Sequence, residues 1–124
     1  MISLPSTLVI MKKTETICAI ATAVGQSGIG IVRISGPLSQ SIAKQVLGVE
    51  LEPRVAYYGD FCDQEGDKVD KGVAIFFPSP NSYTGEDILE LQGHGGMSIL
   101  RCLLETASHF GARLAEPGEF SKRA

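Results

Sequence analysis

Short apolar segments rich in β-branched residues, separated by glycine- or proline-rich turns, dominate this sequence and restrict what it can fold into. Segments of this kind favour β-strands. Thr16–Thr22 and Ile29–Ser35 flank a glycine-rich turn, whereas Arg54–Cys62 and Val69–Phe77 flank a polar one. Each pair predicts a β-hairpin, and Asp87–Gln92 predicts a further strand. We therefore expect a sheet in which several neighbouring strands run antiparallel.

Two other segments have the periodicity of amphipathic helices. In the first, Pro37 suits the first helical position. Leu38, Ile42 and Val46 then recur every four residues. Gly48 provides a C-terminal stop. The second helix carries an apolar stripe that precedes Gly111 and consists of Ile99, Leu100, Leu103, Leu104, Ala107 and Phe110.

The end of the chain adds two short elements. Arg113–Ala115 predicts a last short strand, and Phe120–Ala124 reads as a helix that has only begun. This ending leads us to expect a domain cut from a longer protein. Strands joined as hairpins, together with two main helices, predict an α+β fold with a small mixed or antiparallel sheet.

Composition narrows the class of protein. The chain has 124 residues, 44% of them apolar, which suffices for one domain with its own core. Its net charge is −3 and the two signs are interspersed, so no basic face is expected to bind nucleic acid. Cys18, Cys62 and Cys102 form no C-x-x-C pair. We expect reduced cysteines in a cytoplasmic protein, with no metal ligands among them.

The N-terminal segment is predicted to stand apart from the domain. Residues 1–13 are mildly apolar, too short to span a membrane and without a cleavage signal. They are expected to form a disordered or mistranslated leader, and Met11 offers an alternative start. The domain is therefore expected to cover residues 14–124, with no membrane segment.

Arg33 and Glu90 are the two charges singled out as candidate binding residues. Each lies inside an otherwise apolar strand, where an unpaired charge is costly. Because side chains alternate along a strand, Arg33 points to the opposite face of the sheet from Val32 and Ile34. Glu90 likewise points to the opposite face from Leu89. The two charges could pair with each other, or each could await a ligand. An arginine can hold a carboxylate, and a glutamate can accept two N–H groups of a heterocycle.

The turn formed by Gly93, His94, Gly95 and Gly96 is a further candidate binding element. Backbone N–H groups at a helix start attract polar ligands, although a purely structural turn that needs positive φ is equally consistent. His94 has no evident nucleophile or second base beside it, so no catalytic residue is predicted. Metal binding by Glu86 and Asp87 is disfavoured, because adjacent strand residues point to opposite faces. The glycines at 25–30 do not match a P-loop.

Three blocks of this sequence resemble the opening of the tRNA-modification GTPases of the MnmE (TrmE) family. The first is Gly28–Pro37 (GIGIVRISGP), with Thr16–Thr22 before it. The second, longer and more specific, is Pro80–Gly96 (PNSYTGEDILELQGHGG). The third is Pro117–Ala124. The sequence departs from the family at residues 23–27, where a proline pair and an arginine are expected and Gln26 lacks the charge.

The resemblance implies a fold similar to the folate-binding domain of the glycine-cleavage aminomethyltransferase. It implies a homodimer that binds 5-formyltetrahydrofolate or a related one-carbon folate, with Arg33 and Glu90 as the matching folate residues. It also implies that longer members of the family carry a GTPase domain, which takes GTP, Mg²⁺ and K⁺ and is absent from this sequence. Those proteins act with the flavoprotein MnmG to modify the wobble uridine of certain tRNAs, of the carboxymethylaminomethyl type.

Three functional readings remain open at this point. The domain is a folate-binding and dimerising module, a one-carbon transferase, or a dimer scaffold with a vestigial pocket. The first is favoured, because a transferase needs a positioned acid or base beside the folate. Ligand binding separates the first reading from the third, and single-turnover transfer separates out the second.

Overall fold

The computed structural model describes residues 15–21 and 28–124. The predicted leader, residues 1–13, and the departure at residues 23–27 lie outside the described residues. The described elements are β1 (Ile17–Ile20), β2 (Ile29–Ser35), α2 (Ser39–Leu47), β3 (Tyr57–Cys62), β4 (Lys68–Phe77), β5 (Ile88–His94), α3 (Met97–His109), β6 (Arg113–Leu114) and α4 (Glu119–Arg123).

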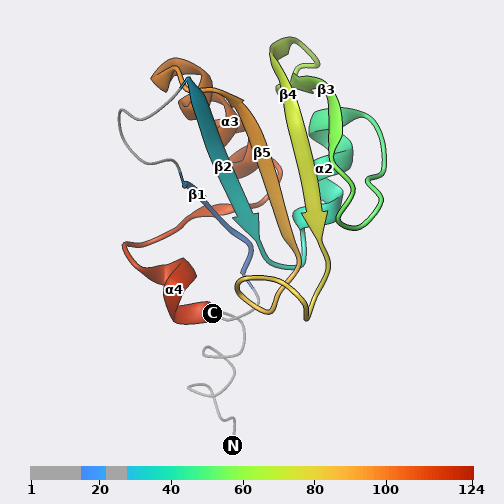
Figure 1. The fold of residues 1–124 in the computed structure, drawn as a ribbon. Helices are drawn as coiled ribbons and strands as arrows, with labels where there is room; N and C mark the ends of the chain where they lie inside the picture. Colours follow the sequence, from blue (N-terminus) through green and yellow to red (C-terminus); the bar gives the residue numbers. More distant parts are fainter. Residues whose placement is uncertain (1–14, 22–27) are drawn as a thin grey trace, which may run out of the picture.

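The strands that the structure describes form one six-stranded sheet in the order β3-β4-β5-β2-β1-β6 (Figure 1). Both predicted pairings are confirmed, since β1 pairs antiparallel with β2 and β3 pairs antiparallel with β4. β5 lies between β4 and β2 and is antiparallel to both. β6 is parallel to β1, which makes the sheet mixed.

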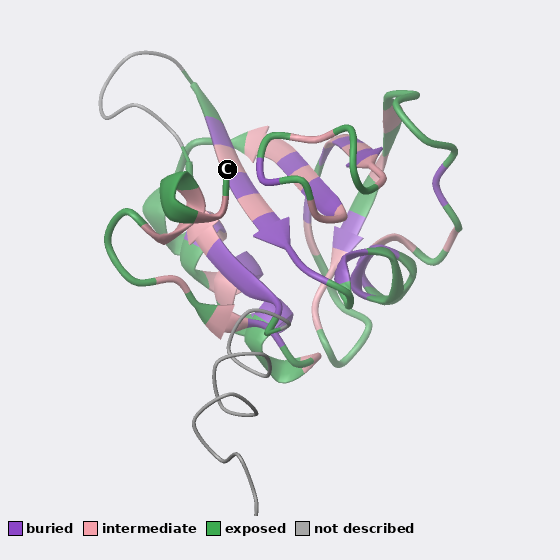
Figure 2. Cartoon of the chain, turned by 90° about the horizontal axis from the view of Figure 1, so that it is seen from below, coloured by how far each residue is buried: buried purple, intermediate pink, exposed green. Residues whose placement is uncertain are grey.

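Both main helices pack on the same face of the sheet. They lie behind the strands in Figure 1, with α3 against β1, β2, β4 and β6 and α2 against β3 and β5. Alternate strand residues point toward them and join the helix residues in one buried cluster. Figure 2 shows the buried positions along the strands and the exposed ones on the outer sides of the helices. The cluster's central residues are Val32, Ile34, Ala74, Leu89, Leu91, Ile42, Val46, Leu100 and Leu103.

Several element boundaries differ from the predicted ones. The first helix begins at Ser39 and not at Pro37, because Gly36 has a φ of 136° and the chain turns before the helix starts. It ends as predicted, with Gly48 left-handed at a φ of 75°. β3 begins at Tyr57, because Arg54 takes a positive φ of 64° that interrupts extended backbone.

The α+β class, with a mixed sheet and two main helices, is confirmed. This architecture is consistent with the likeness to the aminomethyltransferase folate-binding domain that the resemblance implies. Among the described residues, no helix is long and apolar enough to cross a lipid bilayer.

Candidate functional site

Arg33 and Glu90 face each other on the side of the sheet away from the main helices. The register between β2 and β5 sets them directly opposite. Arg33 Nε and Nη2 both donate to Glu90 Oε2, at 3.0 and 2.8 Å. Their side chains are 27% and 16% exposed, so the pair is accessible from solvent. The structure thus joins the two predicted binding residues, as one of the sequence interpretations proposed.

The pair keeps polar capacity for a further group. A guanidinium has five N–H donors, and Arg33 directs two of them to Glu90 among the contacts of the described residues. Glu90 Oε1 accepts from Gln92 Nε2 at 3.2 Å. The surface around the pair also includes half-buried apolar side chains of β2 and β4, namely Ile31, Val73 and Ile75. Such a surface suits a ligand with one flat apolar part and one charged part.

The loop between β4 and β5 closes one end of this face. Ser35 on β2 shares a buried hydrogen bond of 2.7 Å with Thr84 of the loop. Ser35 Oγ also lies 2.8 Å from Glu86 Oε1. Tyr83 places its ring over the Arg33 guanidinium, 5.8 Å from Cζ to the ring centroid. The loop therefore borders the Arg33–Glu90 pair directly.

A network of ion pairs attaches α4 to the same end of the sheet. Arg123 Nη1 donates to Glu86 Oε1 at 3.1 Å, and its Nη2 donates to Glu119 at 3.3 Å. Glu119 also accepts from Arg113 at 2.7 Å. The hydrogen bond from Arg113 and the positive charge of both arginines lower the pKa of Glu119 to about 2. The hydrogen bond to Glu119 and the negative charges of Glu119 and Glu15 raise the pKa of Arg113.

His94 has a partner that the sequence interpretation missed. Its Nδ1 lies 2.7 Å from Oδ1 of Asp70, and its backbone N–H donates to Oδ2 at 2.8 Å. Burial alone would raise the pKa of Asp70, but the N–H groups of His94 and Lys71 lower it below its ordinary value. Because an ionised carboxylate only accepts, Nδ1 carries the ring proton. The sequence signal that could have indicated a role for Asp70 is a single carboxylate inside an otherwise apolar predicted strand.

The glycine turn next to His94 is shorter than predicted. β5 continues through Gly93 and His94, leaving Gly95 and Gly96 to form the connection to α3. None of these three glycines adopts a positive φ. Gly93 is required for space instead, since a Cβ there would approach Asp70 Oδ2 to 2.3 Å. The structure gives Gly93 a packing role, and binding of a ligand by this turn stays a prediction.

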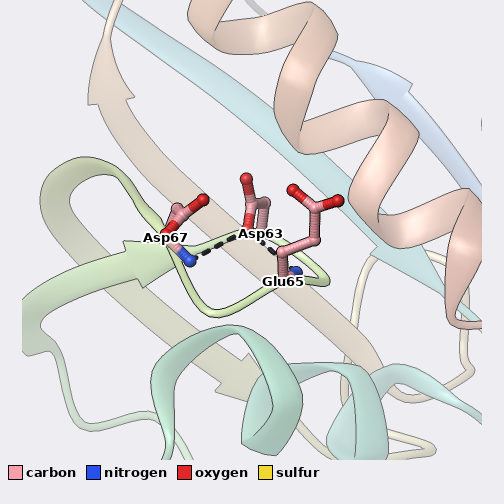
Figure 3. A group of neighbouring side chains, drawn as sticks. All are labelled: Asp63, Glu65 and Asp67. Atoms are coloured by element: carbon pink, nitrogen blue, oxygen red, sulfur yellow. Dashed lines mark hydrogen bonds between the residues drawn. The ribbon is translucent and has the colours of Figure 1, made fainter.

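A group of three carboxylates lies apart from this site, in the β3–β4 turn (Figure 3). Asp63 accepts the backbone N–H groups of Glu65 and Asp67 at 2.9 and 3.0 Å. These bonds are those of an Asx-type turn, which accounts for the grouping. Cys18 lies in the core, where burial raises the pKa of its thiol to about 11 and makes it unreactive.

Fold and site together define a two-layer α+β domain whose second sheet face carries an accessible arginine–glutamate pair. Comparison with known proteins identifies the group more closely. Residues 16–124 match the family described as GTP-binding protein TrmE N-terminus. The chain belongs to this family.

Curated relatives named tRNA modification GTPase MnmE are similar over most of the chain. The protein from Ruthia magnifica subsp. Calyptogena magnifica is 62% identical over 115 residues, which is 92% of this chain and 26% of the relative. Those from Vesicomyosocius okutanii and Saccharophagus degradans are 63% and 59% identical, over 88% and 89% of this chain and 24% of each relative. The chain thus spans about a quarter of the length of these relatives.

Proposed function

We propose that this domain binds a reduced one-carbon folate of the 5-formyltetrahydrofolate type. The observation that carries the proposal is the accessible Arg33–Glu90 pair on the sheet face that the helices leave uncovered. A pterin presents an aminopyrimidinone edge that suits a glutamate, and the glutamate tail of folate suits an arginine. The ligand would meet the N–H donors of Arg33 that Glu90 does not take and Oε1 of Glu90, since both bonds from Arg33 go to Oε2.

Titration calorimetry with 5-formyltetrahydrofolate tests this proposal. Arg33→Ala and Glu90→Ala should each weaken binding by roughly tenfold or more, because each removes one charge-assisted contact. Lys44→Ala is a matched control, since Lys44 is exposed on α2 and pairs only loosely with Glu50 at 3.8 Å. Affinities like those of the wild type in both site variants would remove these residues from the site.

The domain is also proposed to form a homodimer. The half-buried apolar residues beside Arg33, which are Ile31, Val73 and Ile75, are candidates for the surface that a second copy covers. Light scattering with and without 5-formyltetrahydrofolate measures the oligomeric state. A monomer under both conditions, at concentrations above those used for titration, would contradict dimerisation by this domain.

The assembly that this domain serves is proposed from its family. Relatives about four times longer are named tRNA modification GTPases. We infer that this domain contributes to a cytoplasmic GTPase that works with the flavoprotein MnmG on the wobble uridine of certain tRNAs. GTP, Mg²⁺ and K⁺ would act in that GTPase region, outside this sequence. Loss of the carboxymethylaminomethyl group from tRNA after deletion of the gene, measured by mass spectrometry, is the expected result.

One observation favours the alternative that the domain is a one-carbon transferase. The imidazole of His94 is paired with the carboxylate of Asp70, as a general base often is. Single-turnover transfer of the one-carbon unit by the domain would support that alternative, and its loss in His94→Gln would assign the base. We favour the binding module, because neither Asp70 nor His94 has a contact with Arg33 or Glu90.

A further inference from the structure

Tyr83 makes a contact with Arg33 that the folate proposal does not use. Its ring lies over the guanidinium at 5.8 Å, at the distance where a cation is attracted to the face of an aromatic ring. Arg33 also binds Glu90, and its side chain is 27% exposed. Tyr83 itself is 55% exposed, so packing in the core does not hold its ring.

Hydrogen bonds hold the loop that carries Tyr83 on both sides of this residue. Before it, the hydroxyl of Ser82 donates to the carbonyl of Glu86. After it, Thr84 is buried and bonded to Ser35 of β2 at 2.7 Å. The backbone of Gly85 donates back to Ser82 at 3.3 Å. These bonds set the direction of Tyr83 without any contribution from a ligand.

The hydroxyl group of Tyr83 is also held by a hydrogen bond. It lies 3.2 Å from Oγ of Ser121 on α4. α4 is in turn held in place through the ion pair of Arg123 with Glu86 of the β4–β5 loop and that of Glu119 with Arg113 of β6. The ring is thus attached at its base through the loop and at its tip through α4.

We propose that Tyr83 is a positioning residue, which holds the Arg33 guanidinium over Glu90 so that its remaining N–H donors meet the anionic part of the ligand. A long arginine side chain loses considerable rotamer entropy when a ligand immobilises it. Tyr83 and Glu90 restrict Arg33 beforehand, and this lowers the entropy loss on binding. The inference rests on the proposed folate site for the identity of the ligand, but the restriction of Arg33 exists without any ligand.

Two variants separate the ring from the hydroxyl. Tyr83→Leu removes the aromatic face and keeps an apolar side chain, whereas Tyr83→Phe keeps the face and removes the bond to Ser121. Tyr58→Leu is a matched control, because Tyr58 is also exposed and lies under another cation, Lys71, at 5.4 Å. It belongs to the edge strand β3, which β4 and β5 separate from the strand of Arg33.

The first measurement needs no ligand. Nitrogen-15 relaxation of the Arg33 Nε–H group should show a restricted side chain in the wild type, in Tyr83→Phe and in Tyr58→Leu, and a mobile one in Tyr83→Leu. An equally restricted Arg33 in Tyr83→Leu would overturn the proposal.

The second measurement is titration with 5-formyltetrahydrofolate. Tyr83→Leu should weaken binding by about five- to thirtyfold, the factors for a cation–π contact of about 1 kcal/mol at an exposed site and about 2 kcal/mol once desolvated. Tyr83→Phe should stay within about twofold. A loss in Tyr83→Phe as large as in Tyr83→Leu would mean that the ring is not responsible. Should the wild type bind no folate while Arg33 still becomes mobile in Tyr83→Leu, positioning by Tyr83 stands and the folate proposal fails.

Discussion

Asp70 is a carboxylate in a buried position. Its side chain is 7% exposed, and its two oxygens are engaged by the backbone and the ring of His94. A buried carboxylate is tolerated only where such bonds compensate for lost hydration. Gly93 supplies the space for it, since the Cβ of any other residue there would overlap Oδ2. Asp70, Gly93 and His94 therefore depend on one another.

Gly93→Ala should destabilise the protein by about 1–3 kcal/mol, because the added methyl group overlaps Asp70 and must displace its carboxylate. Gly28→Ala is the matched control, as no atom of the described residues lies within 4 Å of a Cβ at that position. Urea unfolding measures both variants. Equal midpoints for the two would show that Asp70 moves aside at no cost.

Asp70→Asn should lower the free energy of unfolding by about 1–3 kcal/mol at neutral pH, because an amide cannot accept both N–H groups of His94 equally well. The pKa of Asp70 is lowered in the folded state, so its ionised form stabilises the fold above the ordinary carboxyl range. This contribution is lost as pH falls through the lowered pKa. The difference between wild type and variant, measured by urea unfolding, should therefore shrink below about pH 4.

At the scale of elements, α4 is short and contributes no buried residue. A helix of five residues has little stability of its own. It is held instead by the ion pair of Glu119 with Arg113 and by that of Arg123 with Glu86, while the pair of Arg123 with Glu119 lies within the helix. Such a network of partly buried pairs contributes more than an isolated surface pair. The position of α4 beside the sheet therefore depends on charge.

Glu119→Gln should release α4 from the sheet at neutral pH and cost about 1–2 kcal/mol after allowance for solvent screening. The pKa of Glu119 is about 2 in the folded state, below its ordinary value. Its contribution is therefore complete above the ordinary carboxyl pKa and is lost as pH falls toward 2. Unfolding curves of wild type and variant should differ at pH 7 and converge near pH 2. A constant difference across this range would contradict the assignment.

Element boundaries followed local rules wherever neighbours did not intervene. Gly48 ended the first helix as expected, because its left-handed φ suits glycine. The predicted start of that helix, Pro37, precedes the observed start, Ser39. The hydroxyl of Ser39 donates to the carbonyls of Ile34 and Asp87, which belong to other segments and which the local sequence pattern does not reveal. The continuation of β5 to His94 has the same kind of cause, since His94 pairs with Ile29 of β2.

At the scale of the whole molecule, one sheet serves two purposes. Its inner face joins both main helices in a single core. Its outer face carries Arg33 and Glu90 among half-buried apolar residues. Within the described residues, every buried side-chain nitrogen or oxygen atom has a hydrogen-bond partner. The polar groups of the outer face are thus compatible with a stable fold.

Substitutions on the two faces should have different consequences. Leu91→Ala on the inner face should cost about 2–5 kcal/mol, because the 1% exposed side chain leaves a cavity in the core. Ile75→Ala on the outer face, beside Glu90, should cost roughly 1 kcal/mol because that side chain is only half-buried. Thermal unfolding measures both. Ile75→Ala should instead weaken the proposed dimer in light scattering, and an unaltered dimer would place the interface elsewhere.

The sequence by itself determined which segments become strands and helices, and which residues share a face. Those features depend on spacing along the chain, such as the alternation around Arg33 and the four-residue period of Ile42 and Val46. Only the tertiary structure decided that Arg33 meets Glu90, that Asp70 binds His94 and that Tyr83 covers the guanidinium. These contacts join residues that are distant in sequence, and register and packing bring them together. No local pattern specifies such pairings.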